Sequence, residues 1–536
     1  MPGGSRSLPV RPSLRHLKLE AKRRVAAGEF PSLHEAQAAI AWEHGLPSWA
    51  TLKQLVGAAG NGNGAGDGQA EGQQSHALAQ LRWVMSRFGG AGQPGWTAPA
   101  DDELREHFDD RFLSVLPPDA LVATISQVAA DLRGGEFAVL GQAPFQAHVE
   151  LNGVQYIAVV QDEPPHRLTG LRALPVGSRV RDARIANPPV RAVGEVPAAV
   201  PAIAGQAFAE LGLVALLIAG GAHRDQSPWV LALGWADLDR GQALDPGHRF
   251  PAPGVTMLVT VTAVLRLAAD NAITLDRPAN DQLRSVRLAD DTITVRELLT
   301  HTAGVDSPTE LYADRVTELA ELMGPVIACT GPRGVLQPSN GGGAVLGQLV
   351  ADVTGMPYAE AATRLVLEPL KLSDSSFPAR PPGTDPDIRP GIGPVIGGPG
   401  AVTGYNLTFN GMFEPIPARM PTLQAVAGLW STGADLVRLG LGWSSLLPGA
   451  LAHEALSPQA RQAPPAEPSH PKDPGAGAGL GWLLNTRAQV AAHAGAGLEG
   501  TACLTVRTTD HRTHVVLTSR MIPVNSIETR LQAAGE

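Results

Sequence analysis

The sequence has little of what marks secreted, membrane-spanning or metal-binding proteins. Its two cysteines, Cys329 and Cys503, are too few for a disulfide framework and have no metal-ligand spacing. No apolar run reaches the roughly 18 residues that a membrane-spanning helix needs. The basic N-terminus is followed by no apolar region of the kind that a secretory signal requires. These absences predict a cytoplasmic protein without membrane contact, metal site or cofactor.

The net charge of the chain is also small for its length. A net charge of -9 on 536 residues is mild, so nucleic acid is not an expected partner. The hydrophobic fraction of 44% allows sizeable cores, and a length prior of roughly 100 to 200 residues per domain gives about three domains. The 60 glycines and 46 prolines predict many turns and at least one linker.

The N-terminal segment predicts a small basic helical unit over residues 1–57. Ser32 and Glu35 have the spacing of a capping box, and Gly45 is typical of a helix end. We expect its basic face to be solvated, although it could bind a protein partner. Residues 58–74, "AAGNGNGAGDGQAEGQQ", have the composition of a flexible linker.

Residues 75–190 predict a compact α+β domain, because helical patterns are followed by strands around the hairpin signal Asn152–Gly153. The order resembles the cystatin- or steroid-isomerase-shaped domain attached to β-lactamase-like proteins of actinomycetes, which are bacteria. Asp109, Asp110 and His107 are expected on a solvated helix face. No catalytic role is therefore predicted for this domain.

Residues 193–536 contain most of the functional information. An apolar hairpin pattern is followed by a helix in "PAPGVTMLVTVTAVLRL", and the landmarks "LDRP", "RELLTHTAG", "LGQLVADVTG", "LEPLKLSDSSF" and "GLWSTGADL" come later in that order. On these landmarks the region resembles the β-lactamase-related serine hydrolases, a group of class C β-lactamases, penicillin-binding proteins and esterases. The resemblance implies a transpeptidase-like fold, in which helices flank an antiparallel sheet and a helical lobe borders the cleft. The chain is thus predicted to be an α+β multidomain protein.

The resemblance implies three motifs that converge on one acyl carbon. A Ser that begins a buried helix attacks, and a Lys one turn later helps to take its proton. In this sequence Gly254 stands at the Ser position and Met257 at the Lys position. The Tyr of a Tyr-x-Asn loop is replaced by Pro338, while Asn340 remains. Two motifs have therefore lost their reactive groups.

The third motif keeps its form. His493 and Gly495 match a His-x-Gly strand, and without a nucleophile we expect His493 to serve in recognition. Changing Gly254 to Ser, Met257 to Lys and Pro338 to Tyr together is expected to restore slow acylation, whereas each single change is not.

Other candidate groups have structural explanations. Thr256 is two residues from Gly254 and points about 200° away around a helix. Ser339 has no adjacent base, and the literal Ser-x-x-Lys at 469–472 lies in a proline-rich loop that cannot form a helix. His301 is expected to hold its own loop through hydrogen bonds.

Two functions from different classes follow. The first is a pseudoenzyme: a member that has lost acyl transfer and acts as a binding or interaction module, with a small acyl or peptide-like ligand in the vestigial cleft. The alternative is an active serine hydrolase, of esterase or β-lactamase type, with a displaced nucleophile such as Ser339. A hydroxyl within about 3.2 Å of a base would favour the alternative.

The predicted linker gives the first test. Limited proteolysis should cut first within residues 58–74, because this stretch has no core to bury, and should leave a fragment that begins near residue 75. N-terminal sequencing of the fragment identifies the cut. A first cut inside residues 193–536 that destroyed that domain would contradict these boundaries.

Overall fold

The computed structural model describes most of the chain from residue 75 onward. The described residues are 75–535 except 134–136, 144, 162–163, 309, 314, 379–399, 418 and 462–475. They belong to one compact unit, Gln74–Glu536. The basic helical unit and the linker predicted for residues 1–74 lie outside the described residues.

The first part of this unit is an α+β arrangement, as predicted. Its helices are α4 (His76–Phe88), α5 (Asp101–His107), α6 (Asp110–Val115), α7 (Pro118–Gln127) and α8 (Ala129–Leu132). Its strands β1 (Ala138–Ala143), β2 (Gln146–Leu151), β3 (Val154–Val160) and β4 (Leu168–Pro175) form an antiparallel sheet in sequence order. Helix α4 packs on β2 and β3.

Local signals explain parts of this arrangement. Asn152 and Gly153 both have positive φ angles, 52° and 73°, in the tight turn between β2 and β3, as their hairpin signal predicts. The expectation of a wholly solvated polar face is wrong for His107. Its ring stacks on Trp83 at 3.6 Å between centroids, and its Nδ1 lies 2.7 Å from the Gln80 amide oxygen.

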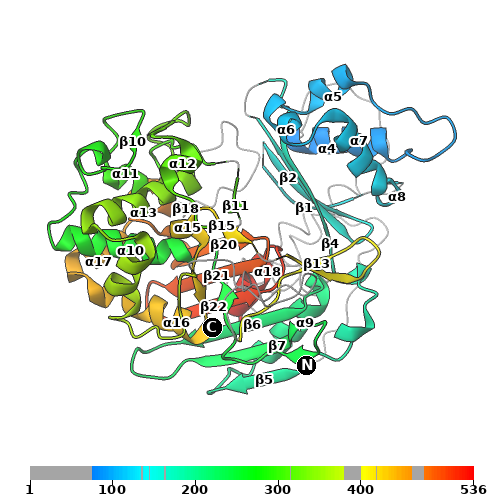
Figure 1. Cartoon of the computed structure of the whole chain (residues 1–536). Helices are drawn as coiled ribbons and strands as arrows, with labels where there is room; N and C mark the ends of the chain where they lie inside the picture. Colours follow the sequence, from blue (N-terminus) through cyan, green and yellow to red (C-terminus); the bar gives the residue numbers. More distant parts are fainter. Residues whose placement is uncertain are drawn as a thin grey trace, which may run out of the picture. The chain divides into compact units, whose positions relative to one another are not determined.

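A ten-stranded sheet dominates the rest of the unit (Figure 1). Its main path runs β17-β18-β19-β20-β21-β22-β6-β7-β5, with β8 paired to β7, and all these pairs are antiparallel. In chain order the strands are β5 (Val190–Val193), β6 (Ala215–Gly221), β7 (Trp229–Asp237), β8 (Gln242–Ala243), β17 (Ala460–Arg461), β18 (Ala476–Ala478), β19 (Leu483–Asn485), β20 (Val490–Gly497), β21 (Gly500–Arg507) and β22 (Thr513–Thr518).

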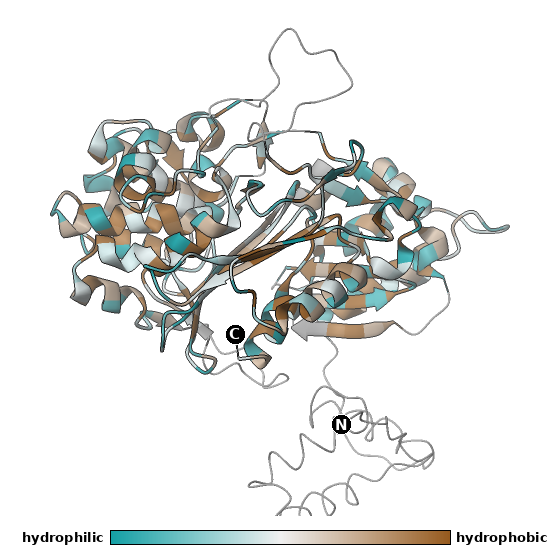
Figure 2. Ribbon diagram, turned by 90° about the horizontal axis from the view of Figure 1, so that it is seen from below, coloured by the Kyte–Doolittle hydropathy of each residue, from teal (hydrophilic) through white to brown (hydrophobic). Residues whose placement is uncertain are grey.

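Helices cover both faces of this sheet. On one face α9 (Val200–Leu211) packs against β6, β7 and α18 (Asn525–Ala533), and on the other α16 (Gly433–Gly442) packs against β22, β6 and β21. Because both faces are covered, the central strands β6 and β22 are almost entirely buried, and their apolar stretches appear brown in Figure 2. Among the described helices, none combines the length and hydropathy needed to cross a bilayer.

A helical lobe adjoins the sheet. It contains α10 (Thr256–Ala269), α11 (Val295–Leu299), α12 (Leu319–Met323), α13 (Asn340–Thr354), α14 (Tyr358–Ala362), α15 (Gln424–Ala427) and α17 (Gly449–Ala455). Short strand pairs join its loops: β9 (Phe250–Pro251) with β16 (Trp430–Ser431), β10 (Arg287–Leu288) with β12 (Val326–Ile327), β11 (Tyr312–Ala313) with β15 (Met420–Pro421), and β13 (Tyr405–Leu407) with β14 (Phe413–Pro415). Helix α10 is buried almost all round, so it forms the centre of the lobe.

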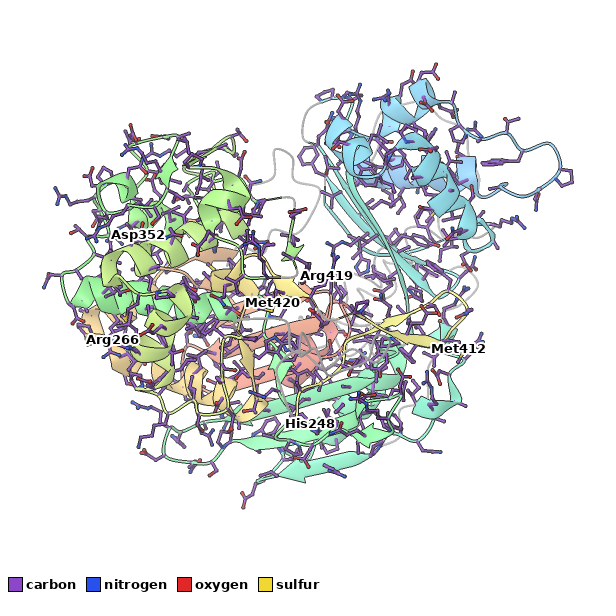
Figure 3. The ribbon with its side chains drawn as sticks, viewed as in Figure 1. His248, Arg266, Asp352, Met412, Arg419 and Met420 are labelled. Atoms are coloured by element: carbon purple, nitrogen blue, oxygen red, sulfur yellow. The ribbon has the colours of Figure 1, made fainter. Side chains whose placement is uncertain are left out.

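Polar side chains inside the lobe fasten its helices. Arg266 on α10 donates to the Leu365 carbonyl at 2.6 Å (Figure 3). Asp352 on α13 accepts from the backbone N–H groups of Arg284 and Ser285 at 2.7 and 3.0 Å. These bonds give buried polar groups their partners, which a close-packed interior requires.

A buried arginine joins the α+β sheet to the large sheet. Arg520 is 3% exposed, and its guanidinium donates to the carbonyls of Leu211 and Gly212 at 2.6 Å and of Pro175 at 2.9 Å. It also lies 5.9 Å from the centroid of the Phe413 ring. Burial lowers the pKa of Arg520 to about 10, so the group stays charged at neutral pH.

Removal of this guanidinium should destabilise the protein strongly. Arg520→Met leaves three buried carbonyls without their donors, so we expect the free energy of unfolding to fall by about 3 kcal/mol in urea denaturation. The control is Arg191→Met, which breaks a half-exposed ion pair with Asp245 and should cost less than about 1 kcal/mol. Equal losses in the two variants would contradict the assigned role.

Candidate functional site

The position expected for a nucleophile is a tight backbone turn. Gly254 lies between β9 and α10 with a φ angle of +72°, and its N–H donates to the Val426 carbonyl at 3.0 Å. A Cβ atom there would lie 2.6 Å from the Gly495 nitrogen and would also collide with the Ala494 carbonyl on β20. Space and backbone conformation both require glycine at position 254.

The surviving glycine of the His-x-Gly motif is the other half of this contact. A Cβ on Gly495 would lie 2.7 Å from the Gly254 nitrogen and 2.7 Å from the Pro253 carbonyl carbon. The start of α10 therefore lies backbone to backbone against β20. We call this the glycine contact, and Gly495 has a packing role in it.

Met257 fills the space near the expected lysine position. Its side chain is 7% exposed, and a Cβ on Gly343 of α13 would collide with the Met257 Sδ and lie 2.9 Å from its Cε. The Met257 thioether thus occupies the space that a side chain at position 343 would fill. Met257 joins α10 to α13 and supplies no amine that could accept a proton.

The Tyr-x-Asn loop contributes a helix cap. Pro338 and Asn340 are exposed, and Asn340 is the first residue of α13. Between them, the Ser339 hydroxyl donates to the Val305 carbonyl at 2.6 Å and accepts from the Gly342 N–H at 3.1 Å. The single hydroxyl proton of Ser339 is therefore engaged with a carbonyl oxygen and not with a base.

The other candidate hydroxyls are accounted for in similar terms. The Thr256 hydroxyl donates to the Ala252 carbonyl at 2.8 Å and accepts from the Leu429 N–H at 3.2 Å. The Ser-x-x-Lys at 469–472 lies outside the described residues. His301 contacts the Ser339 backbone, since its Nδ1 accepts from that N–H at 3.4 Å. This contact agrees with the loop-holding role expected for His301.

His493 is buried under the glycine contact. Its side chain is 5% exposed, its ring lies 5.0 Å from that of Trp482, and its Nε2 has no hydrogen-bond partner among the described residues. Burial, with a smaller contribution from His301, lowers the pKa of His493 to about 3. The imidazole is neutral at pH 7 and is not presented to solvent, which favours packing over recognition.

One buried acid near this site was missed from the sequence. Glu499 is 8% exposed, burial raises its pKa to about 7, and its Oε1 has no hydrogen-bond partner among the described residues. The neighbouring Tyr312 hydroxyl accepts from the Leu498 N–H at 2.7 Å. The short strand pair β11 and β15, which lies beside Arg419 in Figure 3, covers Glu499. Because both strands come from distant segments of the chain, the local sequence "GLEG" gives no signal of this burial.

The space beside Glu499 is small. A cavity of about 10 Å³ lies there, which is room for a single water molecule at most. Its lining residues are Pro251, Pro253, Tyr312, Arg419, Pro421, Ala427, Trp430, Gly497 and Glu499. Within the described part of the chain, no three or more His, Cys, Asp or Glu side chains gather where they could hold a metal ion.

The antiparallel sheet, the helical lobe and the positions of the three motifs define a serine-hydrolase scaffold. A family model described as Beta-lactamase matches residues 207–535, and the chain belongs to this family. No protein of curated function matches the sequence.

Solved structures are similar to this chain at low sequence identity. The penicillin-binding protein from Bacillus halodurans is 17% identical with a TM-score of 0.50, and the match covers 63% of this chain and all of that one. The octameric penicillin-binding protein homologue from Pyrococcus abyssi is 18% identical with a TM-score of 0.49 over 63% and 77% of the two chains. The class C β-lactamase from Rhodobacter sphaeroides is 17% identical with a TM-score of 0.49 over 63% and 98%.

The glycine contact can be tested by adding one methyl group. Gly254→Ala should lower the free energy of unfolding by about 3 kcal/mol or more, because the new Cβ meets the backbone of β20. Gly334→Ala is the matched control: Gly334 has a φ angle of +79° but no atom within 4 Å of the added Cβ. It should cost about 1 kcal/mol, from backbone conformation alone. Similar losses in chemical denaturation would show that position 254 has room for a side chain.

The burial of His493 predicts a pH dependence. Because its pKa falls from 6.5 in the unfolded chain to about 3 in the folded one, only the unfolded chain takes up this proton as the pH drops below 6.5. Stability should therefore decrease toward acid, and His493→Gln should remove about 2 kcal/mol of the loss between pH 8 and pH 5. Urea titrations at both pH values measure this difference. An equal loss in both proteins would contradict a buried neutral imidazole.

Proposed function

We propose that this member of the β-lactamase family does not carry out acyl transfer and acts as a binding or interaction module. The glycine contact is the observation that carries this proposal. In the family pattern the acyl-enzyme forms on a nucleophilic side chain just before α10, and the backbone of β20 leaves no room for one at Gly254.

The surrounding groups support the same conclusion. The hydroxyls of Ser339 and Thr256 donate to backbone carbonyls, so neither is paired with a base. His493 is neutral and could accept a proton in principle, but its low pKa makes it a weak base at pH 7. Members of a catalytic group act together, so the loss of the nucleophile and its base together removes most of the rate enhancement.

The displaced-nucleophile alternative is not favoured by the position of Ser339. For Ser339 to attack, it would have to give up its bonds to Val305 and Gly342 and so uncap α13. A small acyl or peptide-like ligand in the cleft remains a prediction, as does a protein partner bound through residues 1–57.

The glycine contact also bears on whether acylation can be restored by introducing the three missing side chains. The sequence alone suggested that Ser, Lys and Tyr at positions 254, 257 and 338 would together restore slow acylation. The described geometry argues against this outcome, because Ser at position 254 carries the same Cβ that collides with β20. The triple variant should therefore be destabilised and unreactive.

Covalent probes test the proposal directly. A fluorophosphonate and a fluorescent penicillin should leave the folded full-length chain unlabelled under conditions that label an active serine hydrolase of the same family to completion. Gel fluorescence and intact mass spectrometry measure the labelled fraction.

The control variant Ser339→Ala makes the result specific. Stoichiometric labelling that maps to a Ser or Thr would overturn the proposal. Loss of that label in Ser339→Ala would establish the displaced-nucleophile hydrolase in its place.

A further inference from the structure

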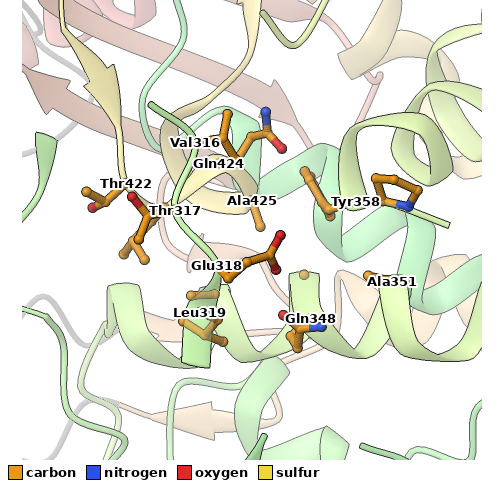
Figure 4. Close-up of a pocket in the computed structure, with 14 residues that line it drawn as sticks. Val316, Thr317, Glu318, Leu319, Gln348, Ala351, Tyr358, Thr422, Gln424 and Ala425 are labelled. Atoms are coloured by element: carbon orange, nitrogen blue, oxygen red, sulfur yellow. The ribbon is translucent and has the colours of Figure 1, made fainter. Parts of the chain in front are cut away.

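A separate pocket lies in the helical lobe. It is a hollow of about 150 Å³, partly open to solvent, against the face of α13 formed by Ala344, Gln348 and Ala351 (Figure 4). The segment 316–319 closes one side, and residues 422–425 with the start of α14 close the other. None of the motif residues Gly254, Met257, Pro338, Asn340, His493 or Gly495 lines it.

One unpaired carboxylate lies at the solvent-exposed edge of the pocket. Glu318 contributes the only carboxylate among the lining residues, and none of them is Lys, Arg or His. Figure 4 shows this carboxylate between Ala425, Gln348 and Tyr358. It has no ion-pair or hydrogen-bond partner among the described residues, and the nearby Arg315 pairs with Glu321 instead. A cation would therefore be the favoured occupant.

A fixed aromatic ring stands beside the carboxylate. The Tyr358 hydroxyl lies 2.6 Å from the Thr260 hydroxyl, which itself donates to the Ala425 carbonyl at 2.6 Å. The ring also packs edge-on against Phe377, with centroids 5.4 Å apart. Because these contacts hold the ring in place, its π system can attract a cation without first being ordered.

The remaining lining suits an organic cation better than a metal ion. Ala344, Gly347 and Leu423 supply small or apolar surface, and a single carboxylate is too few ligands for Ca²⁺ or Mg²⁺. Gln348 donates its amide N–H to Asp352 at 3.0 Å, which leaves its amide oxygen as an acceptor for an N–H donor. An engineered cavity of about 150 Å³ in another protein holds benzene, so this volume fits about four to six non-hydrogen atoms.

We propose that this pocket binds a small organic monocation, an alkylammonium ion of about four to six non-hydrogen atoms. The ammonium group contacts Glu318 and the Tyr358 ring, and the alkyl part lies on the apolar side of the pocket. The proposal does not depend on whether the chain carries out acyl transfer, because it involves none of the motif residues.

Ligand-observed NMR on the full-length protein tests the pocket. Butylammonium should give saturation transfer that saturates with concentration, whereas the uncharged butanol and the anionic butyrate should bind at least about tenfold more weakly. Equal binding of the three probes would overturn the proposal.

Two variants assign the binding to the pocket. Glu318→Gln keeps the shape and removes the charge, so it should weaken butylammonium about tenfold. Glu321→Gln removes a carboxylate on the same segment that is already paired with Arg315, and it should leave binding unchanged. Ala351→Leu should fill the pocket and abolish the signal. Wild-type affinity in Glu318→Gln, or in a folded Ala351→Leu protein, would contradict the assignment.

Discussion

The glycine contact is the constraint on which the rest of the described site depends. Gly254 and Gly495 each lack the one atom that would separate α10 from β20, and each would collide with the other's segment if it had a Cβ. Helix α10 is the buried centre of the helical lobe, while β20 lies within the large sheet. The contact therefore fixes the lobe against the sheet at the place where acyl transfer would require an open nucleophile.

Neighbouring substitutions are consistent with this closure. Met257 occupies the volume beside Gly343, so apolar packing between α10 and α13 fills the position expected for a lysine. Ser339 caps α13, and His493 lies neutral beneath the contact. A buried imidazole without a charge avoids the high cost of an unpaired ion in an apolar site. Packing and helix capping therefore account for the positions of these three residues.

The sequence predicted what depends on local pattern. The turn at Asn152–Gly153 follows from residue type and spacing. The interpretation of Gly254 and Met257 as replaced reactive groups also rests on residue type, and it stays a prediction. The close approach of Gly254 to Gly495 could not be predicted, because it joins segments far apart in the chain. The burial of His493 and Glu499 could not be predicted from the sequence for the same reason. Each depends on packing by elements that are distant in the chain, so the local sequence gives no signal of it.

A crystal structure of the protein soaked with a cephalosporin at high concentration tests the central claim most directly. We expect Gly254 to keep its positive φ angle against Ala494 and Gly495, with no acyl adduct on any hydroxyl nearby. A covalent adduct on a Ser or Thr of this region, or a ligand between α10 and β20 with the glycine contact opened, would contradict it.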